Sequence, residues 1–506
     1  MEIKIIQQII ALEKIPLFAD AFTSSISLNQ FYGIELDDFA HEMAILSLWL
    51  AEHQMNRVFD EQLEGYGKSK PILPLKQAGK IVQGNAARTD WKEVCPATKD
   101  DEVYIIGNPP YLGARMQDAE QKKDMAIVFH GINGYNNMDY ISCWLHKAKS
   151  FIEGFNAKAA FVTTNSICQG EQVALLWPHI ISDKIEIGFA YQSFKWTNNA
   201  KGNAGVTVII LSLRNISNEL KYLFSGNIKK EAKNINPYLL DAVNTIIIGR
   251  SKPLSKFPEM DFGSMPNDNG NLILDETEKQ TLISPFPKAK PFIKKLMGAE
   301  DFIKGISRYC LWLDEDNFKE AKGIKPIADR IENVRKLRQN SSREATKKLA
   351  RVPFRFGEVR HQETDSIIIP RHSSENRDYI PIGFLNAETI IADSAMAIYD
   401  AQPWLFGVLH SKMHIVWVRA VGGKLEERLR YSAKLCYNTF PFPDITLKQK
   451  ENLNLYVFAI LDERAKYPQK TMAWLYNPDT MPKALQQAHE DLDMAIEQCY
   501  RLHPFS

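Results

Sequence analysis

The sequence lacks any long apolar run that would cross a membrane. Its most apolar stretch, 391–418, is interrupted by Asp393, Asp400 and Lys412 well inside the roughly 20 residues that a membrane helix needs. Cysteine is also scarce, because the 506 residues hold six and no two of them lie closer than 25 positions. That spacing excludes a CxxC zinc knuckle or redox pair and favours reduced thiols in the cytoplasm.

An excess of charge of one sign is missing as well. The chain has 62 Lys and Arg against 61 Asp and Glu, a formal net charge of +1, so its overall charge does not predict a nucleic-acid partner. Hydrophobic residues make up 45% and charged residues 24%, which excludes disorder over most of the chain. At about 150 residues per domain, a chain of this length is expected to form roughly three domains.

The first part of the chain, 1–215, alternates short apolar runs with helical patterns, which predicts a mostly parallel α/β sheet. One helix is expected over 37–54, where Phe39, Met43, Leu46 and Leu50 recur at helical spacing. A second helix is expected over 140–152, and strands are expected over 30–36, 102–107, 158–164, 185–190 and 206–213.

The pattern changes after residue 215. Residues 216–310 are rich in Pro, Gly, Asn and Lys, and 325–360 is basic and helix-prone, with eleven Lys or Arg against four Asp or Glu. Strand patterns with Pro-rich turns follow up to 445, and the last 60 residues have helical patterns. We therefore expect three parts with the bounds 1–215, 216–445 and 446–506.

The most specific motif is Asn108-Pro109-Pro110-Tyr111, directly after the apolar strand EVYIIG. An exocyclic amine on an aromatic ring, such as adenine N6, is a poor nucleophile because its lone pair is delocalised. Two acceptors, the Asn108 side-chain oxygen and the Pro109 carbonyl, would localise that lone pair by binding the two amine hydrogens. The two prolines would fix the acceptors in advance, and Tyr111 would stack on the ring. The alternative is a rigid loop at a strand end.

Methyl transfer to such an amine requires a donor, and in open α/β sheets ligands bind at the carboxyl ends of strands. Glu35 ends an expected strand, where its carboxylate would accept hydrogen bonds from a ribose diol or would cap the next helix. Asn85 lies in a Gly-Asn-Ala turn that would contact an adenine edge or is an ordinary surface turn. Asp139 would line the cofactor or target pocket or cap a helix.

Several segments carry a family resemblance. GNPPYLGA, NMDYISCWLHKA, AFVTTNSICQGEQ and FAYQSFKW resemble successive motifs of gamma-type N6-adenine DNA methyltransferases, in particular the MmeI-like type IIL restriction–modification family. RLRYSAKLCYNTFPFP and AWLYNPDTMPKALQQAHEDLDMAIEQCYR resemble the end of that family's specificity domain and its C-terminal helices. The resemblance runs in order along nearly the whole chain.

The resemblance implies a fold, a donor and a target. It implies an α/β fold with an incomplete class I (Rossmann-like) methyltransferase domain, an α+β target recognition domain and a helical C-terminal tail. It also implies S-adenosylmethionine as donor and a flipped adenine in double-stranded DNA as target. Asn108 to Tyr111 would form the catalytic loop, Glu35 would hold the cofactor ribose, and Asn85 would lie near the cofactor adenine. Phe194, in QSFKW, would stack on the flipped base opposite Tyr111, or it is a core aromatic.

One departure from the family concerns the cofactor site. The family has a Gly-rich turn before the acidic ribose ligand, whereas the only glycine before Glu35 here is Gly33. The family's N-terminal endonuclease is not found either. The sequence therefore predicts half a cofactor site and a missing central strand, with unpaired sheet edges. A separately encoded N-terminal methyltransferase or nuclease fragment is the expected partner in that case.

Contacts with DNA are expected from local basic residues. The stretch 325–360 has a net charge of +7, and its cations would contact phosphates. Arginines and histidines in the strand-and-turn region that follows would read bases or contact phosphates. The candidate DNA contacts are Arg335, Lys336, Arg338, Arg360, Arg371 and Lys424. The alternative for each is a structural role or a solvated helix face.

Three functions remain open at this point. The first is sequence-specific adenine-N6 methylation of DNA in a restriction–modification system. The second is a truncated or split remnant that binds DNA but needs an N-terminal partner for catalysis. The third is methylation of a protein or RNA amine, which the long basic and strand-rich C-terminal half disfavours. No metal is expected, because His410 and His414 have i, i+4 spacing but no evident third ligand.

Overall fold

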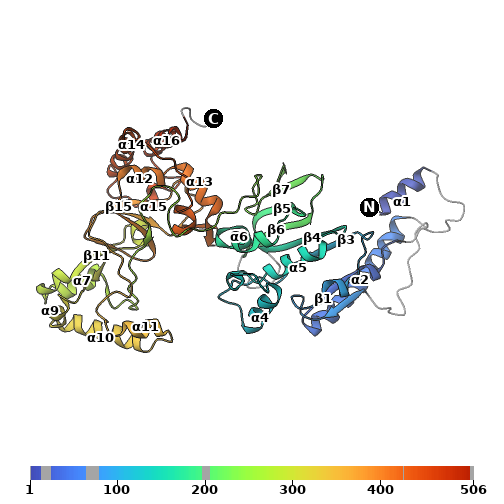
Figure 1. Ribbon diagram of the computed structural model, residues 1–506, viewed down its shortest axis with the longest axis horizontal. Helices are drawn as coiled ribbons and strands as arrows, with labels where there is room; N and C mark the ends of the chain where they lie inside the picture. Colours follow the sequence, from blue (N-terminus) through green and yellow to red (C-terminus); the bar gives the residue numbers. More distant parts are fainter. Residues whose placement is uncertain (1, 13–23, 64–78, 197–205, 426, 502–506) are drawn as a thin grey trace. The chain divides into compact units, whose positions relative to one another are not determined.

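The computed structural model describes residues 2–12, 24–63, 79–196, 206–425 and 427–501. The chain divides into two compact units, which are treated separately below (Figure 1). The first unit comprises residues 1–167 and 175–245, and the second comprises 168–174 and 246–506. In the described ranges, no helix combines the length and the apolar character that a membrane span needs.

A six-stranded sheet forms the centre of the first unit, in the order β3-β4-β6-β5-β7-β8. Only the pairs β3/β4 and β5/β7 are parallel, so the expectation of a mostly parallel sheet is wrong. Nine residues separate β5 from β6, fewer than a parallel crossover requires, and the two strands pair antiparallel. The strands are β3 Val103–Gly107, β4 Ala157–Thr164, β5 Ile185–Trp196, β6 Val206–Asn215, β7 Lys221–Ser225 and β8 Ile228–Ala232.

Two further strands of the first unit form a separate parallel pair, β1 (Tyr32–Glu35) and β2 (Lys80–Gln83). Among the described strands, β1 pairs only with β2, and β3 pairs only with β4. Within the described residues, β1 and β3 therefore each have one edge without a strand partner, as do β2 and β8.

The helices of the first unit differ strongly in burial. In α5 (Ser142–Ile152) one face is buried, including Cys143, Leu145 and Ile152. In α2 (Asp38–Gln62) the residues that the sequence places on the apolar face are exposed, with Phe39 at 72% and Leu50 at 53%. The expected helix is therefore confirmed, while its apolar face lies uncovered. The other helices of this unit are α1 Glu2–Ala11, α3 Trp91–Val94 and α4 Ala119–Val128, and α6 (Gly170–Leu176) bridges the two units in sequence.

Three small sheets and a helical cluster form the second unit. The sheets have the orders β10-β12-β11-β16, β15-β13-β17-β9 and β14-β19-β18. Their strands are β9 Asp261–Phe262, β10 Ile273–Asp275, β11 Ile293–Met297, β12 Arg308–Leu311, β13 Ser366–Pro370, β14 His372–Ser373, β15 Gly383–Leu385, β16 Thr389–Ile391, β17 Ala395–Tyr399, β18 Gly423–Leu425 and β19 Arg428–Arg430. The two inner strands of the second of these sheets, β13 and β17, are fully buried.

Two helical regions that the sequence predicts are present in the second unit. The basic stretch contains α10 (Lys325–Gln339) and α11 (Glu344–Leu349), and the C-terminal part is helical, as expected. The 216–310 segment contains more strand and helix than its Pro and Gly content indicates, because β7 to β12 all begin within it. The remaining helices are α7 Glu276–Ile283, α8 Ala299–Lys304, α9 Phe318–Lys322, α12 Pro403–Leu409, α13 Lys412–Val421, α14 Leu447–Ala465, α15 Met472–Leu475 and α16 Lys483–Tyr500.

Candidate active site and DNA-facing residues

The Asn-Pro-Pro-Tyr loop begins where β3 ends, at Gly107. Asn108 is exposed, Pro109 is buried, and Tyr111 is half-buried. The described residues provide no hydrogen bond to the Asn108 side chain. The loop is therefore fixed by a buried proline, while its carboxamide remains open to a ligand.

The far end of this loop is held at Leu112. The Leu112 N–H donates to Asp139 Oδ1 at 3.0 Å, and its carbonyl accepts from the Tyr140 N–H at 3.0 Å. The buried Gln117 amide donates to the same carbonyl at 3.1 Å and to the Met138 carbonyl at 3.0 Å. The loop is thus anchored at both ends, before any substrate arrives.

Asp139 is nearly buried, with 6% of its surface exposed. Burial raises the pKa of its carboxyl group, and the N–H groups of Ile141 and Leu112 act in the opposite direction. Its second oxygen accepts from the Ser166 hydroxyl at 3.3 Å, just beyond the end of β4. The sequence left Asp139 a place in the cofactor or target pocket or a role as a helix cap. Its contacts with the N–H groups of Leu112 and Ile141 show that it holds the end of the Asn-Pro-Pro-Tyr loop to the segment before α5.

Glu35 and the Gly84-Asn85 turn lie together at the carboxyl end of the β1–β2 pair. Glu35 is level with Gln83, and its carbonyl accepts from the Gly84 N–H at 2.8 Å. Its Oε1 accepts from the Leu36 N–H at 2.9 Å, just before α2. The cap of α2 is Asp37, whose side chain accepts from the Ala40 N–H, so the alternative of Glu35 as a helix cap is wrong. No hydrogen bond to the Glu35 Oε2 is found within the described residues, and this oxygen has the chemistry that a ribose diol requires.

Asn85 is held from two sides. Its Oδ1 accepts from the Ala87 N–H at 2.9 Å, and its Nδ2 donates to the buried carboxylate of Asp124 at 2.9 Å. The Tyr140 phenol is a further hydrogen-bond partner of the Asn85 side chain. The turn is thus held beside Glu35, whose carboxylate fits the ribose of S-adenosylmethionine.

The strand register places Phe194 at the same sheet edge as the catalytic loop. Thr164 at the end of β4 and Phe194 near the end of β5 both pair with Val208 of β6. Since β3, β4 and β5 run in one direction, their carboxyl ends meet at one edge. Phe194 is half-buried, and its ring centroid lies 6.4 Å from that of Trp196.

Arg338 corrects one expectation about DNA contact. Its side chain is buried, with 0% exposure, and its guanidinium donates to five backbone carbonyls at 2.8 to 3.1 Å. The acceptors belong to Pro266, Asn267, Leu349, Val352 and Arg355. Because all its N–H donors are used, Arg338 joins α10 to two loops and α11, and it is unavailable to phosphate.

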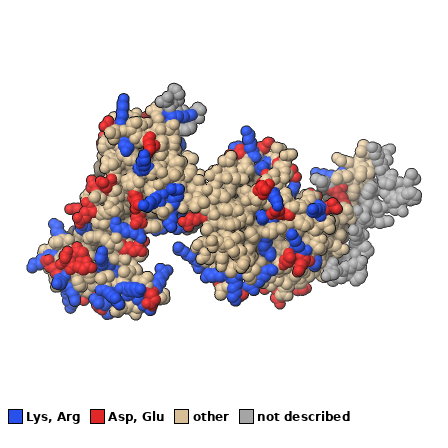
Figure 2. Space-filling view, viewed as in Figure 1, with Lys and Arg blue, Asp and Glu red and all other residues tan. Residues whose placement is uncertain are grey.

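The rest of the basic stretch lies on the surface of α10 and α11. Figure 2 shows Lys and Arg gathered over these helices, interspersed with acidic side chains. Lys336 is exposed, whereas Arg335 pairs with Glu332 at 3.1 Å and Arg330 pairs with Glu278 at 2.5 Å. These pairings lower the positive charge that the stretch presents.

Arg360 and Arg371 lie around one aromatic ring. Their guanidinium carbons are 5.4 and 4.7 Å from the ring centroid of Phe262, which is 37% exposed. Arg360 also pairs with Glu358 and, at 3.5 Å, with Asp261. Arg371 donates to the Asp393 carbonyl at 3.0 Å. Both expected DNA contacts are therefore half-buried and held in place by neighbours.

A basic sheet face was missed by the sequence analysis. In β19, Leu429 is buried while Arg428 and Arg430 are exposed, and His372 of β14 lies opposite Arg430. Burial lowers the pKa of His372, and the charges of Arg371, Arg430 and Arg428 lower it further. The alternation of basic and apolar residues in RLR is the sequence signal for this face. Lys424 lies on the adjacent strand, β18, opposite Leu429.

His410 and His414 do not share one helix, since α12 ends before His410 and α13 begins at Lys412. His410 contacts the Arg464 guanidinium, and His414 Nε2 lies 2.8 Å from the Tyr431 hydroxyl. Both imidazoles are buried in the helical cluster.

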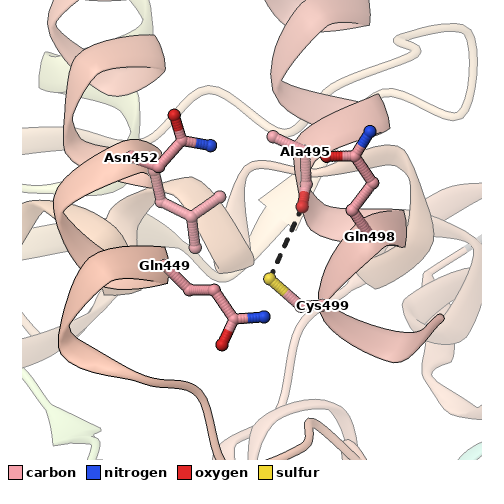
Figure 3. Close-up of a pocket in the computed structure, with 6 residues that line it drawn as sticks. Gln449, Asn452, Ala495, Gln498 and Cys499 are labelled. Atoms are coloured by element: carbon pink, nitrogen blue, oxygen red, sulfur yellow. Dashed lines mark hydrogen bonds between the residues drawn. The ribbon is translucent and has the colours of Figure 1, made fainter. Parts of the chain in front are cut away.

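A cavity of about 310 Å³ also lies in this unit, between α14 and α16 (Figure 3). Its lining includes Gln449, whose amide oxygen already caps α14, and Cys499, whose thiol donates to the Ala495 carbonyl. It carries no charged group and none of the candidate residues.

Comparison with known proteins decides the family. Residues 1–225 match the DNA-methyltransferase domain of MmeI, 241–444 its target recognition domain, and 445–506 its C-terminal domain. The chain belongs to the MmeI family. It is 44% identical over its whole length to DNA methyltransferase A of Bacillus subtilis, and it covers 57% of that protein.

A solved structure of the type IIL restriction–modification enzyme MmeI in complex with DNA resembles the chain with a TM-score of 0.87 at 38% identity. The match covers 94% of this chain and 64% of that one. The chain thus has the MmeI arrangement of a methyltransferase domain, a target recognition domain and a helical C-terminal region. It spans about three fifths of the length of these two relatives.

Proposed function

We propose that this chain carries the base-binding and DNA-recognition parts of a restriction–modification methyltransferase that transfers a methyl group from S-adenosylmethionine to adenine N6 in double-stranded DNA. The observation that supports this most is the Asn108 carboxamide, exposed at the carboxyl end of β3. It stands on a loop that Pro109 and the Leu112 anchor hold in place.

The chemistry follows from this loop. The Asn108 Oδ1 and the Pro109 carbonyl accept the two hydrogens of the flipped amine, which localises the nitrogen lone pair for attack. Tyr111 and Phe194 stack on the two faces of the base, which offsets part of the cost of unstacking it. S-adenosylmethionine supplies the methyl group, and Glu35 and Asn85 hold its ribose and adenine.

DNA is held by the second unit. Arg428 and Arg430 of β19 present cations to the phosphate backbone, with His372 beside them as a neutral hydrogen-bonding group. Lys424, which is level with Leu429, adds a cation from the other face of the same sheet. Arg360 and Arg371 are held by Phe262 in fixed orientations, as direct readout of a base edge requires.

A methylation assay with labelled S-adenosylmethionine and plasmid DNA tests the function on residues 1–506 joined to the part of the Bacillus relative that lies outside the match. We expect incorporation with the wild type and a loss of at least about a thousandfold in Asn108→Ala, because a charge-localising acceptor is removed. The matched control is Asn136→Ala, an exposed amide on the first unit that should leave the rate unchanged. Equal rates in wild type and Asn108→Ala would refute the proposal.

The free edges of β1 and β3 favour a second proposal about the same unit. We propose that a polypeptide segment with a parallel strand pairs with both edges and covers the exposed face of α2, and that S-adenosylmethionine binds well only when it is present. Tyr104 and Ile106 of β3 are 62% and 82% exposed, in addition to Phe39 of α2. Apolar side chains exposed at this density mark an interaction surface.

Calorimetric titration with S-adenosylmethionine tests this proposal. We expect residues 1–506 alone to bind the donor at least about a hundredfold more weakly than the same residues joined to the N-terminal region of the Bacillus relative. A second arm supplies that region as a separate polypeptide, which distinguishes a linked segment from a partner chain. Micromolar binding by residues 1–506 alone would contradict it.

A further inference from the structure

A buried carboxylate on α4 joins the two halves of the proposed site. Asp124 is 1% exposed and lies between the Asn85 turn and the start of α5. Its Oδ2 accepts from Asn85 Nδ2 at 2.9 Å and from the Tyr140 hydroxyl at 2.6 Å. Its Oδ1 accepts from Arg88 Nε at 2.5 Å. One side chain therefore receives three donors from two separate segments.

Each segment that Asp124 holds belongs to a different part of the site. Asn85 forms the turn that faces the cofactor adenine in the proposed function, and its Oδ1 in turn holds the Ala87 N–H. Tyr140 follows Asp139, and its backbone N–H donates to the Leu112 carbonyl at the end of the catalytic loop. The hydrogen bonds thus run from Asn85 through Asp124 and Tyr140 to Leu112.

The burial of this chain of contacts makes it stiff. Tyr140 is 5% exposed, and burial followed by the Asp124 carboxylate raises the pKa of its phenol, which stays protonated as the donor. A buried carboxylate is costly to leave without its donors, so the arrangement resists rearrangement. Arg88 is exposed and also pairs with Glu120 at 2.9 Å.

We infer that Asp124 is a positioning residue that fixes the cofactor-binding turn at Asn85 relative to the catalytic loop at Leu112, through Tyr140. Asp124 lies outside every motif that resembles the family, and it contacts neither base nor donor. The inference rests on the proposed function for its consequence in catalysis. The coupling between the two segments is a property of the protein alone and is measured separately.

Hydrogen exchange of the full-length protein, without DNA or donor, tests the coupling. In Tyr140→Phe, which keeps the ring but loses the hydroxyl, we expect amide exchange to rise at least about threefold both in 84–89 and in 108–113. Asp124→Asn should have the same two effects, and it should add nothing in 108–113 when Tyr140→Phe is already present. Glu120→Gln is the control, because it removes the exposed ion pairs of Glu120 with Arg88 and Lys123 and leaves the three donors of Asp124 in place.

A rise in exchange that is confined to 84–89, in both Tyr140→Phe and Asp124→Asn, overturns the inference. Asp124 would then stabilise only the Asn85 turn.

Enzyme kinetics provide a second readout. Tyr140→Phe should raise the KM for S-adenosylmethionine about tenfold and change kcat by less than about threefold. If the donor is neither bound nor used even by residues 1–506 joined to the part of the Bacillus relative outside the match, the proposed function fails, while the exchange result still decides the role of Asp124.

Discussion

The backbone N–H of Leu112 donates to the carboxylate of Asp139 at 3.0 Å, across 27 residues of sequence. This bond ties the end of the catalytic loop to the segment that starts α5. Its geometry assigns Asp139 to the loop, whereas the sequence left open a place in the cofactor pocket.

Replacing Asp139 distinguishes a role in anchoring the Asn108 loop from a role in binding the cofactor. We expect Asp139→Ala to lower kcat for methylation by about ten- to a hundredfold, because the loop loses its anchor, while the Kd for S-adenosylmethionine changes by less than about threefold. Steady-state kinetics and calorimetry on one preparation measure both. An increase in Kd with an unchanged kcat would return Asp139 to the cofactor pocket.

Arg338 and its two neighbours on α10 should behave differently. Arg338→Met leaves five carbonyls without their donor, and we expect it to lower the free energy of unfolding by about 3 kcal/mol or more. Chemical denaturation of the two proteins measures this difference.

The double replacement Arg335→Ala and Lys336→Ala should leave the free energy of unfolding unchanged. It should reduce the slope of log K against log salt for DNA binding by up to about 2. An unchanged slope would exclude α10 from the DNA interface.

The positions of helices and loops could be predicted from the sequence, whereas the exposure of their side chains could not. The helix at Phe39 and the loop at Asn108 follow from spacing and from the prolines, which act within a few residues. The exposure of Phe39 and the complete burial of Arg338 depend on segments far away in the chain, and local patterns do not contain them. Arg338 in particular looks like any cation of a basic helix until the carbonyls around it are known.

In the candidate site, too, some residues have a local sequence signal and others do not. Asn108, Tyr111 and Glu35 are candidates from the sequence because each lies at or just after the end of an apolar strand, where ligands bind in α/β sheets. Asp124 was missed because a lone acid in an ordinary helix carries no signal of its partners. Arg428 and Arg430 alternate with apolar Leu429, and this pattern would have identified an exposed strand face.

The basic sheet face of the second unit is expected to bind phosphates. Arg430→Ala should weaken binding of both specific and unrelated DNA by a similar factor, about three- to tenfold, since a phosphate contact carries no sequence information. Fluorescence anisotropy with a cognate and a scrambled duplex measures the two affinities. A loss confined to the cognate duplex would show that Arg430 reads a base.

Asp493 on α16 should make stability depend on pH. Burial raises the pKa of its carboxyl group to about 6, although Tyr379 and the Lys412 N–H both donate to it. A carboxyl whose pKa is raised on folding stabilises the fold when protonated, and this contribution is lost as pH rises through about 6.

Comparison with a variant that cannot titrate isolates this effect. The Tm of the wild type minus that of Asp493→Asn should fall as the pH is raised from 4 to 7. Differential scanning calorimetry at several pH values gives the difference. A Tm difference that stays constant over this range would show that Asp493 is ionised throughout.

The central claim is that the Asn108 loop activates an adenine amine in DNA. The most direct measurement is mass spectrometry of nucleosides from plasmid DNA treated with S-adenosylmethionine that carries a deuterated methyl group and with residues 1–506 joined to the part of the Bacillus relative outside the match. The account predicts labelled N6-methyladenine as the methylated nucleoside, and none with Asn108→Ala. Label in a cytosine derivative, or label found only in protein or RNA offered in the same reaction, would contradict it.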